Sequence, residues 1–395
     1  MNDSTRQGHY GIVGRLGRAA RFAAVASLLA VGVVSQAAGA ATSSHSSKVA
    51  GFHAETSVNP SSAANALSGV SCASSNFCMG VGYYVIAATD RTLIERWDGA
   101  RWVRDSSANP SPTVDYLSGV SCFRSTFCMA VGTQQQGAAQ HTLIERWNGI
   151  GWKTSASPDP GATNSLNAVS CPRPNFCVAV GNQHVGNFER TLVETFNGTK
   201  WTTMSSTNVG ARNLNNLLGV SCASTSFCVA VGVREAAGQQ RTLVERYNGR
   251  KWQTVPSTNP GVTDILNEVS CPTSRFCEAV GNQVRGAATQ TLIERWGGAN
   301  WITDASTNPN QHSYLWGVSC VHPGTCEAVG TTQSGATSHT LVEKLAGGAW
   351  SIVQSGNPAA QNGFNGIACE NRTTCNSVGF EGTGVAYFSL IERGA

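Results

Sequence analysis

Residues 117–152 read LSGVSCFRSTFCMAVGTQQQGAAQHTLIERWNGIGW, and this stretch recurs with small changes through most of the 395-residue chain. The most regular landmark of each copy is its first cysteine. These cysteines follow one another at intervals of 49 to 51 residues: Cys72, Cys122, Cys171, Cys222, Cys271, Cys320 and Cys369. Self-similarity at a fixed period indicates a repeat architecture, so we interpret residues 48–395 as one domain.

Each copy contains four short apolar segments, which in residues 117–152 are LSGVSC, CMAVG, TLIER and a run that begins at Trp152. The segments are rich in Val, Ile, Thr and aromatic residues, and Gly, Asn, Pro and Ser separate them. This composition is typical of β-strands joined by tight turns. No segment of the domain keeps a 3.6-residue apolar period, so we expect no helix there. The sequence predicts an all-β fold, a seven-bladed β-propeller with four antiparallel strands per blade.

The two ends of the domain indicate how the ring closes. The last copy stops after residues 391–395, IERGA, and therefore lacks its fourth strand. Residues 48–56 resemble an unpaired fourth strand, because Phe52 lies eight residues before Pro60, as Trp102 lies eight before Pro110. We expect this N-terminal strand to pair with residues 390–393, which would complete the last blade and remove two free sheet edges.

The first forty residues have the pattern of a signal peptide. A basic segment ends at Arg21, an apolar run covers residues 22–34, and Ala38 and Ala40 supply the small residues before a cleavage site. We predict cleavage after Ala40, and an uncleaved membrane anchor is the alternative. Residues 41–47 are expected to form a short flexible leader. These features predict a secreted protein without a membrane span in its mature form.

All fourteen cysteines fall into pairs with the spacing C-x5-C. The second members are Cys78, Cys128, Cys177, Cys228, Cys277, Cys326 and Cys375. An even count at one repeated spacing in an exported chain favours one disulfide within each repeat, each contributing about 2 kcal/mol. Metal binding is the alternative, but structural zinc sites use closer spacings and no histidine recurs beside these pairs. We therefore expect no metal and no cofactor.

With these motifs the chain resembles secreted bacterial repeat proteins that carry V-S-C…C-x-A-V-G…T-L-I-E-R-W-x-G-x-x-W units, within the β-propeller superfold. The resemblance covers residues 48–395 and implies architecture rather than activity, because propellers carry many unrelated functions. Sialidase-type and kelch-type repeats match less well. Where a sialidase motif has its Asp, the first copy has Trp97.

Two residue types recur in every blade or nearly so, and we assign both a structural role. A glutamate recurs in the third segment of each copy: Glu95, Glu145, Glu194, Glu245, Glu294, Glu343 and Glu392. A residue repeated around a ring cannot mark one active centre, and buried carboxylates need hydrogen-bond partners. The tryptophans that open the fourth segment are expected to fill space between sheets rather than to stack on sugars.

Function is therefore expected in residues that break the repeat. The candidates are Tyr83, Tyr84, Tyr116, His184, Phe188, Arg234, Arg285, His312, Tyr314 and Trp316. Among them Tyr116, Tyr314 and Trp316 are the predicted ligand-binding residues, because aromatic anchors often dominate binding energy. Ordinary drift between repeats is the alternative for each residue taken singly.

Charge and loop length narrow the function further. Outside the signal segment the chain has 23 basic and 22 acidic residues, a balance that disfavours a nucleic-acid partner. Nine residues separate the second and third segments in the copies, as residues 83–91 do, and we expect these to be short uniform loops. Catalytic propellers usually carry long unique loops. We expect a monomeric, non-catalytic binding module whose partner is a protein or a cell-surface glycan. A multivalent lectin and a glycan hydrolase or lyase are the alternatives.

Overall fold

The computed structural model describes residues 51–210, 214–384 and 386–394, and the regular secondary structure of these residues is entirely β-strand. The predicted signal peptide, its cleavage site after Ala40 and the leader lie outside the described residues. Within the described ranges no helix is present that could span a membrane. The expectation of an all-β chain without helices is confirmed for this part of the chain.

The strands pair antiparallel in groups of four, which we number as units 1 to 7 in chain order. The first strands are β2 (Ala64–Ser74), β6 (Val114–Arg124), β10 (Thr163–Arg173), β14 (Asn215–Ser224), β18 (Thr263–Thr273), β22 (His312–His322) and β26 (Gln361–Cys369). The second strands are β3 (Phe77–Ile86), β7 (Phe127–Gln136), β11 (Phe176–Val185), β15 (Phe227–Ala236), β19 (Phe276–Arg285), β23 (Thr325–Ser334) and β27 (Cys375–Gly382).

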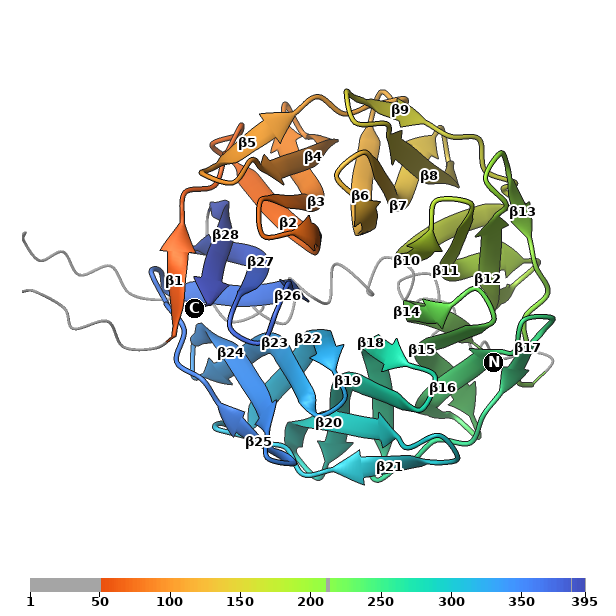
Figure 1. The fold of residues 1–395 in the computed structure, drawn as a ribbon, viewed down its shortest axis with the longest axis vertical. Helices are drawn as coiled ribbons and strands as arrows, with labels where there is room; N and C mark the ends of the chain where they lie inside the picture. The colour runs from red at the N-terminus through yellow and green to blue at the C-terminus, as the bar shows by residue number, and fades with distance from the viewer. Residues whose placement is uncertain (1–50, 211–213, 385, 395) are drawn as a thin grey trace, which may run out of the picture.

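The outer half of each unit consists of a long third strand and a short fourth strand. The third strands are β4 (Thr89–Trp97), β8 (Ala139–Trp147), β12 (Phe188–Phe196), β16 (Gln239–Tyr247), β20 (Ala288–Trp296), β24 (Thr337–Ala346) and β28 (Tyr387–Gly394). The fourth strands are β5 (Trp102–Asp105), β9 (Trp152–Thr154), β13 (Trp201–Thr203), β17 (Trp252–Thr254), β21 (Trp301–Asp304), β25 (Ala349–Ile352) and, for unit 7, β1 (Phe52–Glu55). Figure 1 shows the units around a central opening, with the first strands innermost.

Unit 7 combines strands from the two ends of the chain. β1 pairs antiparallel with β28, and the register runs from Phe52 opposite Gly394 to Glu55 opposite Ile391, which agrees with the predicted pairing. Figure 1 shows the two strands side by side at the junction of the first and last colours. Units 7 and 1 also meet through a parallel bridge between Ala64 and Tyr387, as units 1 and 2 do between Asp90 and Val114.

The segments that follow the fourth strands, which we call linkers, form hydrogen bonds with two units at once. We call this arrangement the linker latch. Between units 1 and 2, Ser107 Oγ lies 2.6 Å from Thr92 Oγ1 and donates a hydrogen bond of 2.8 Å to Glu145. The N-terminal segment repeats this pattern between units 7 and 1. Asn59 Oδ1 accepts a 2.7 Å hydrogen bond from the Ser389 amide, and Ser57 donates to Glu95 at 2.8 Å.

A second repeated contact explains the serine of the V-S-C motif. Ser71 Oγ accepts a 2.9 Å hydrogen bond from the backbone N–H of Cys122 in the next unit. Five further serines do the same for the first cysteine of the following unit: Ser121, Ser170, Ser221, Ser270 and Ser319. Unit 7 has Ala368 at this position and so has no hydroxyl to offer to Cys72.

The hydrophobic core lies between neighbouring units rather than inside each one. One cluster joins Met79 and Ile94 of unit 1 to Leu117 and Trp152 of unit 2. Another joins residues of unit 1 to Val378 and Ile391 of unit 7. The repeated tryptophans belong to these clusters and are nearly inaccessible, which agrees with their predicted packing role. Each unit therefore needs its neighbours to bury its apolar faces.

The strands are longer than the sequence pattern predicts, and the expected nine-residue loops are wrong. β3 continues to Ile86 and β4 begins at Thr89, so only two residues form the turn. Polar residues continue the ladder in unit 2, where Gln134 lies opposite His141 and Gln135 opposite Gln140. Apolar periodicity fails to mark this part of the strands, because backbone pairing and cross-strand contacts do not require buried side chains.

The seven disulfides join the predicted pairs, each within its own repeat. Each one crosses the hairpin between the first and second strands, and in unit 1 Cys72 lies directly opposite Cys78. The described residues contain no free cysteine.

Candidate functional site

The first strands surround a central cavity of about 160 Å³, and in each strand one or both of two consecutive positions line it. In unit 1 these are Ser68 and Gly69, which follow the buried Leu67. The register shifts between Leu67 and Gly69. This β-bulge places an extra residue in the first strand and turns it toward the axis, as bulges do when they redirect a side chain. The same shift recurs in the other units.

The first of these two positions varies around the ring: Ser68, Ser118, Asn167, Leu218, Asn267, Trp316 and Asn365. The three asparagines connect neighbouring units. Asn167, Asn267 and Asn365 donate from Nδ2 to the carbonyls of Leu217, Leu315 and Leu67, at 2.8, 2.8 and 2.9 Å. These residues are part of the scaffold. Trp316 at the same position has no side-chain amide to make this bond, so its presence needs another explanation.

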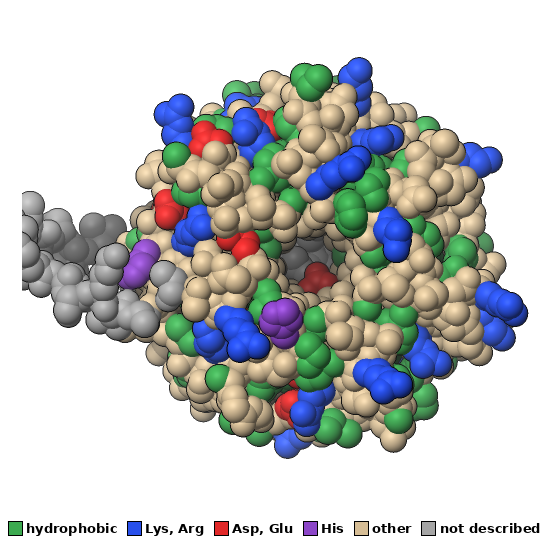
Figure 2. All heavy atoms as spheres, in the orientation of Figure 1, with side chains coloured by type: hydrophobic (Ala, Val, Ile, Leu, Met, Phe, Trp, Pro, Cys, Tyr) green, Lys and Arg blue, Asp and Glu red, His purple; other side chains and the backbone are tan. Residues whose placement is uncertain are grey.

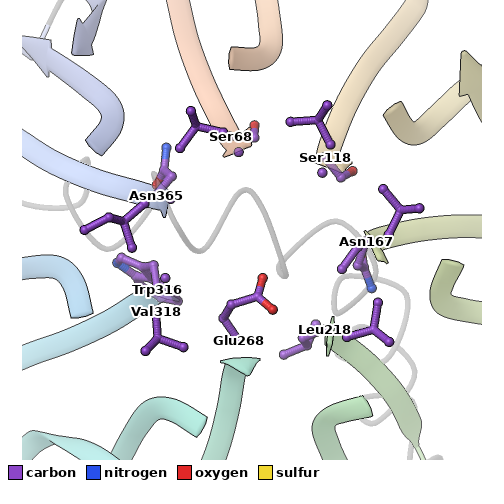
Figure 3. Close-up of a pocket in the computed structure, with 18 of the residues that line it drawn as sticks. Ser68, Ser118, Asn167, Leu218, Glu268, Trp316, Val318 and Asn365 are labelled. Carbon is purple, nitrogen blue, oxygen red and sulfur yellow. The ribbon is translucent and has the colours of Figure 1, made fainter. Parts of the chain in front are cut away.

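The second position holds Gly or Ala in six units and Glu268 in unit 5. Neighbouring strands approach closely here, which favours small residues: a Cβ added to Gly366 would lie 3.1 Å from the Cα of Gly69. Among the described residues that line the cavity, Glu268 is the only charged one. Figure 3 shows its carboxylate directed toward the centre of the ring.

Gly219 of unit 4 makes room for this carboxylate. A Cβ at Gly219 would lie 2.7 Å from Glu268 Oε1 and 2.7 Å from its Cα, so any larger residue would displace the glutamate. Glu268 Oε1 also accepts a 3.0 Å hydrogen bond from the backbone N–H of Val269. These contacts hold the side chain against the wall while its carboxylate faces the cavity.

Two of the predicted binding residues lie together beside Glu268. The rings of Tyr314 and Trp316 are stacked, with centroids 5.6 Å apart and planes within 4° of each other. Trp316 lines the cavity, and Figure 3 shows it on the strand next to that of Glu268. Both aromatic side chains are half-buried. The channel therefore presents one aromatic wall and one carboxylate on adjacent units.

Tyr116 occupies on β6 the position that Tyr314 occupies on β22, opposite Thr133 rather than Thr331. It is not among the residues that line the cavity, although Ser118, two residues further on, is. The structure thus brings Tyr314 and Trp316 together and leaves Tyr116 apart from them.

The other candidates lie away from the cavity. Tyr84 accepts a 2.9 Å hydrogen bond from Arg104, whose guanidinium is 4.8 Å from the centre of its ring. His184 lies opposite Glu189, one pair before Phe188 closes the β11–β12 hairpin. The remaining members, Tyr83, Arg234, Arg285 and His312, lie on second strands or, for His312, at the start of β22. These residues are distributed over the rims of several units.

Sequence reasoning missed Glu268, although the signal was present. Aligned copies of the first segment read LSGVSC, LSGVSC, LNAVSC, LLGVSC, LNEVSC, LWGVSC and FNGIAC, and only one has a charge at the third position. Glu268 does not recur from copy to copy, unlike the glutamates of the third segments. A charged residue at a position that otherwise holds Gly or Ala is a stronger signal than a charged residue that recurs in every copy.

The repeated glutamates have the structural role predicted for them. All seven are fully buried, and their carboxylates accept hydrogen bonds from the linkers, as Glu294 does from Ser257 Oγ at 2.6 Å. Burial raises the pKa of most of these carboxyls to about 7, although the hydrogen bonds oppose that shift: Glu95, Glu145, Glu194, Glu245, Glu294 and Glu392. Burial also raises the pKa of Glu343.

Glu278 has the largest perturbation, since burial raises its pKa to about 9 and nearby Asp304 adds to the shift. Its side chain is fully buried, and neither carboxylate oxygen has a hydrogen-bond partner among the described residues. A substrate has no access to it, so the perturbed pKa marks a structural position rather than a catalytic one.

Two groups in the described ranges bring three possible metal ligands together, and both contain a disulfide. They are Cys72, Cys78 and Glu370, and Glu327, Cys369 and Cys375. Disulfide sulfurs are not thiolates, so neither group offers the ligands of a zinc site.

Comparisons with known proteins define the class of fold. No protein family matches the chain, and no curated protein matches it by sequence. Among solved structures, YCF48 bound to D1 peptide has a TM-score of 0.55 at 13% identity, over 88% of this chain and 96% of that one. The WD40 β-propeller domain of Doa1 has a TM-score of 0.55 at 9% identity, over 88% and 97%.

YCF48 from Cyanidioschyzon merolae is also similar, with a TM-score of 0.52 and 13% identity over 87% of this chain and 98% of that chain. At such identities the likeness concerns the fold alone. The chain has the architecture of a β-propeller built from disulfide-bonded four-stranded repeats.

Proposed function

We propose that this protein is a secreted, non-catalytic interaction module, a seven-bladed propeller whose N-terminal strand completes the last blade. It binds a protein partner at the mouth of the central channel. The observation that carries the proposal is the cluster of Glu268, Tyr314 and Trp316, which places a carboxylate and a stacked aromatic pair on adjacent units at one place in the ring. Binding specificity in a symmetric scaffold must reside in such exceptions.

The size of the channel limits what enters it. A volume of about 160 Å³ is close to the roughly 150 Å³ of an engineered protein cavity that binds one benzene molecule. A folded domain or a polysaccharide chain does not fit this space, but one extended side chain does. The partner segment therefore lies across the mouth and inserts a single residue.

The walls of the channel favour a cationic side chain. Trp and Tyr faces attract Lys and Arg through cation–π interactions, and the carboxylate of Glu268 supplies an opposite charge on the neighbouring strand. The partner class is thus a protein segment with an exposed Lys or Arg. YCF48, a propeller of similar fold, has been captured with a peptide, which is a precedent for this mode of binding.

The alternatives have less support. A multivalent lectin needs the same aromatic platform in several units, but in the described residues the stacked pair Tyr314–Trp316 exists only in unit 6. A glycan hydrolase or lyase needs an accessible pair of acidic groups. In the described part of the chain, the cavity wall contains a single carboxylate, that of Glu268.

Random peptides displayed on phage and selected on the disulfide-intact protein provide the test. We expect enriched peptides to carry Lys or Arg, and their affinity to fall about tenfold or more in Trp316→Ala and in Glu268→Gln. Ile352→Ser, an exposed change on the outer strand of unit 6, is the matched control. Peptides that bind all variants equally would place recognition elsewhere.

Two further measurements separate this function from its alternatives. Glycan arrays should show no binding that depends on Tyr314, and cell-wall polymers should not be cleaved. Turnover that a single substitution abolishes would overturn the non-catalytic assignment. For the location, the intact mass of protein recovered outside expressing cells should correspond to a chain that begins at Ala41.

A further inference from the structure

The two faces of the ring carry different charges. We define the hairpin face as the end of each unit where the first and third strands finish and the second and fourth begin. In unit 1 this is the end where Ser74 pairs with Phe77 and Trp97 with Trp102. The opposite end, where the linkers cross, is the linker face.

The hairpin face carries nine exposed basic side chains that form no ion pair with the described residues. They are Arg124, Arg146, Lys153, Arg173, Lys200, Arg250, Lys251, Arg275 and Arg372. The described ion pairs of this face involve other cations, such as Arg96 with Asp105 at 3.0 Å and Arg295 with Asp304 at 3.1 Å. Among the described residues Asp98 is the only exposed carboxylate on this face, and it lies 4.0 Å from Arg101.

These cations are unevenly distributed over the units. Eight of the nine belong to units 2 to 5, and we call these eight the basic crescent. In the space-filling view of Figure 2, blue Lys and Arg side chains far outnumber red Asp and Glu side chains. A nearly neutral chain thus concentrates positive charge on one side, because its acidic residues are mostly buried in latches or lie toward the linker face.

Unit 2 adds two exposed apolar side chains to the crescent. Ile150 is 91% exposed at the tip of the turn between β8 and β9, where Lys153 follows closely. Phe123 is 44% exposed beside Arg124 at the end of β6. Exposed apolar side chains of this size at loop tips, surrounded by cations, are suited to an interface that is both anionic and apolar.

We propose that the hairpin face docks on an anionic lipid surface, with the basic crescent over the headgroups and Ile150 and Phe123 inserted between them. A broad face carrying dispersed cations matches a plane of negative charge. The two apolar tips distinguish a lipid surface from a soluble polyanion, which offers nothing for them to enter. In this orientation the linker face, toward which Tyr314 lies, remains open.

Vesicle sedimentation tests the proposal with the mature chain at about 0.15 M salt. We expect binding to vesicles that contain phosphatidylglycerol and none to pure phosphatidylcholine. Each basic residue near such a surface changes affinity about fivefold, so Lys153→Glu should weaken binding about 25-fold. Arg285→Glu, an exposed arginine at the linker-face end of β19, is the matched control and should change it less than about twofold.

The apolar tips are tested separately. Ile150→Ser should weaken vesicle binding about tenfold. Ile352→Ser, the same substitution at an isoleucine that is 46% exposed on an outer edge strand, should not. Soluble polyphosphate and duplex DNA serve as competing probes. Equal affinity for these polymers without any effect of Ile150→Ser would overturn the lipid proposal in favour of a soluble polyanion. An equal loss of vesicle binding in Lys153→Glu and Arg285→Glu would overturn the lipid proposal as well.

The proposal is independent of the channel. Trp316→Ala and Glu268→Gln should bind vesicles as the parent does, so failure of peptide binding and failure of membrane docking are distinguishable.

Discussion

Glu294 and Glu268 belong to the same unit and have opposite roles. Glu294 is fully buried and accepts hydrogen bonds from Ser257 Oγ at 2.6 Å and the Thr258 amide at 3.4 Å. It has a counterpart in every unit. Glu268 is half-buried, has no counterpart and faces the cavity. In this repeat protein, the recurring polar residues therefore hold the ring together, while a polar residue without a counterpart in other units lines the channel.

The largest expected effect follows from removing the strand that supplies the seventh latch. Deletion of residues 41–60 takes away β1, Ser57 and Asn59, and leaves β28 as an open sheet edge. We expect a melting temperature lower by roughly 10 °C or more and concentration-dependent aggregation. Calorimetry and light scattering measure both. A truncated protein as stable and monomeric as the parent would show that β1 is dispensable for closure.

Breaking one linker latch should have the next largest effect on the free energy of unfolding. Glu294→Ala should lower the free energy of unfolding by about 2–3 kcal/mol, because buried donors from the linker lose their acceptor. Glu268→Ala should change it by less than about 0.5 kcal/mol, since that side chain is half-buried and its carboxylate faces the cavity. Urea unfolding of the two variants measures the difference. Similar losses in both would contradict the division between scaffold and site.

The latch carboxyls also predict how stability depends on pH. Their pKa values rise from 4.5 to about 7 on folding, so the folded state binds protons more tightly than the unfolded chain. The stabilisation is fully present below about pH 4.5 and is lost as pH rises through about 7. We expect the melting temperature to fall by roughly 5 °C between pH 5 and pH 8. Glu294→Gln, which does not titrate, should reduce that slope.

The smallest predicted effect concerns the one missing serine bond. Ala368→Ser would give unit 7 the hydroxyl that other units offer to the next cysteine amide, as Ser319 does to Cys369 at 3.0 Å. We expect a gain of about 0.5–1 kcal/mol in unfolding free energy. The matched loss should appear in Ser319→Ala. If Ala368→Ser destabilises the protein, then the boundary between units 7 and 1 differs from the other six.

Much of the architecture follows from the sequence alone. The fifty-residue period, the C-x5-C pairs and the Val-rich segments identify strands, disulfides and units, because strand propensity and disulfide reach are local properties. The position of Phe52 relative to Pro60 is enough to predict that β1 completes unit 7. The ends of the strands were not predictable in this way. Residues such as Tyr84 and Arg91 extend the hairpins by backbone pairing, which leaves no apolar pattern.

The channel and the charged face were decided by the tertiary structure. Tyr314 and Trp316 stand out in the sequence, but only the bulge at the channel turns Trp316 and Glu268 toward one cavity. The net charge likewise does not reveal the basic crescent. The acidic residues that balance its charge in the composition are buried in latches or lie on the other face. The composition gives only the number of charged residues. Recognition depends on which charged side chains lie on the same face of the ring, and the placement of the strands around the ring determines this.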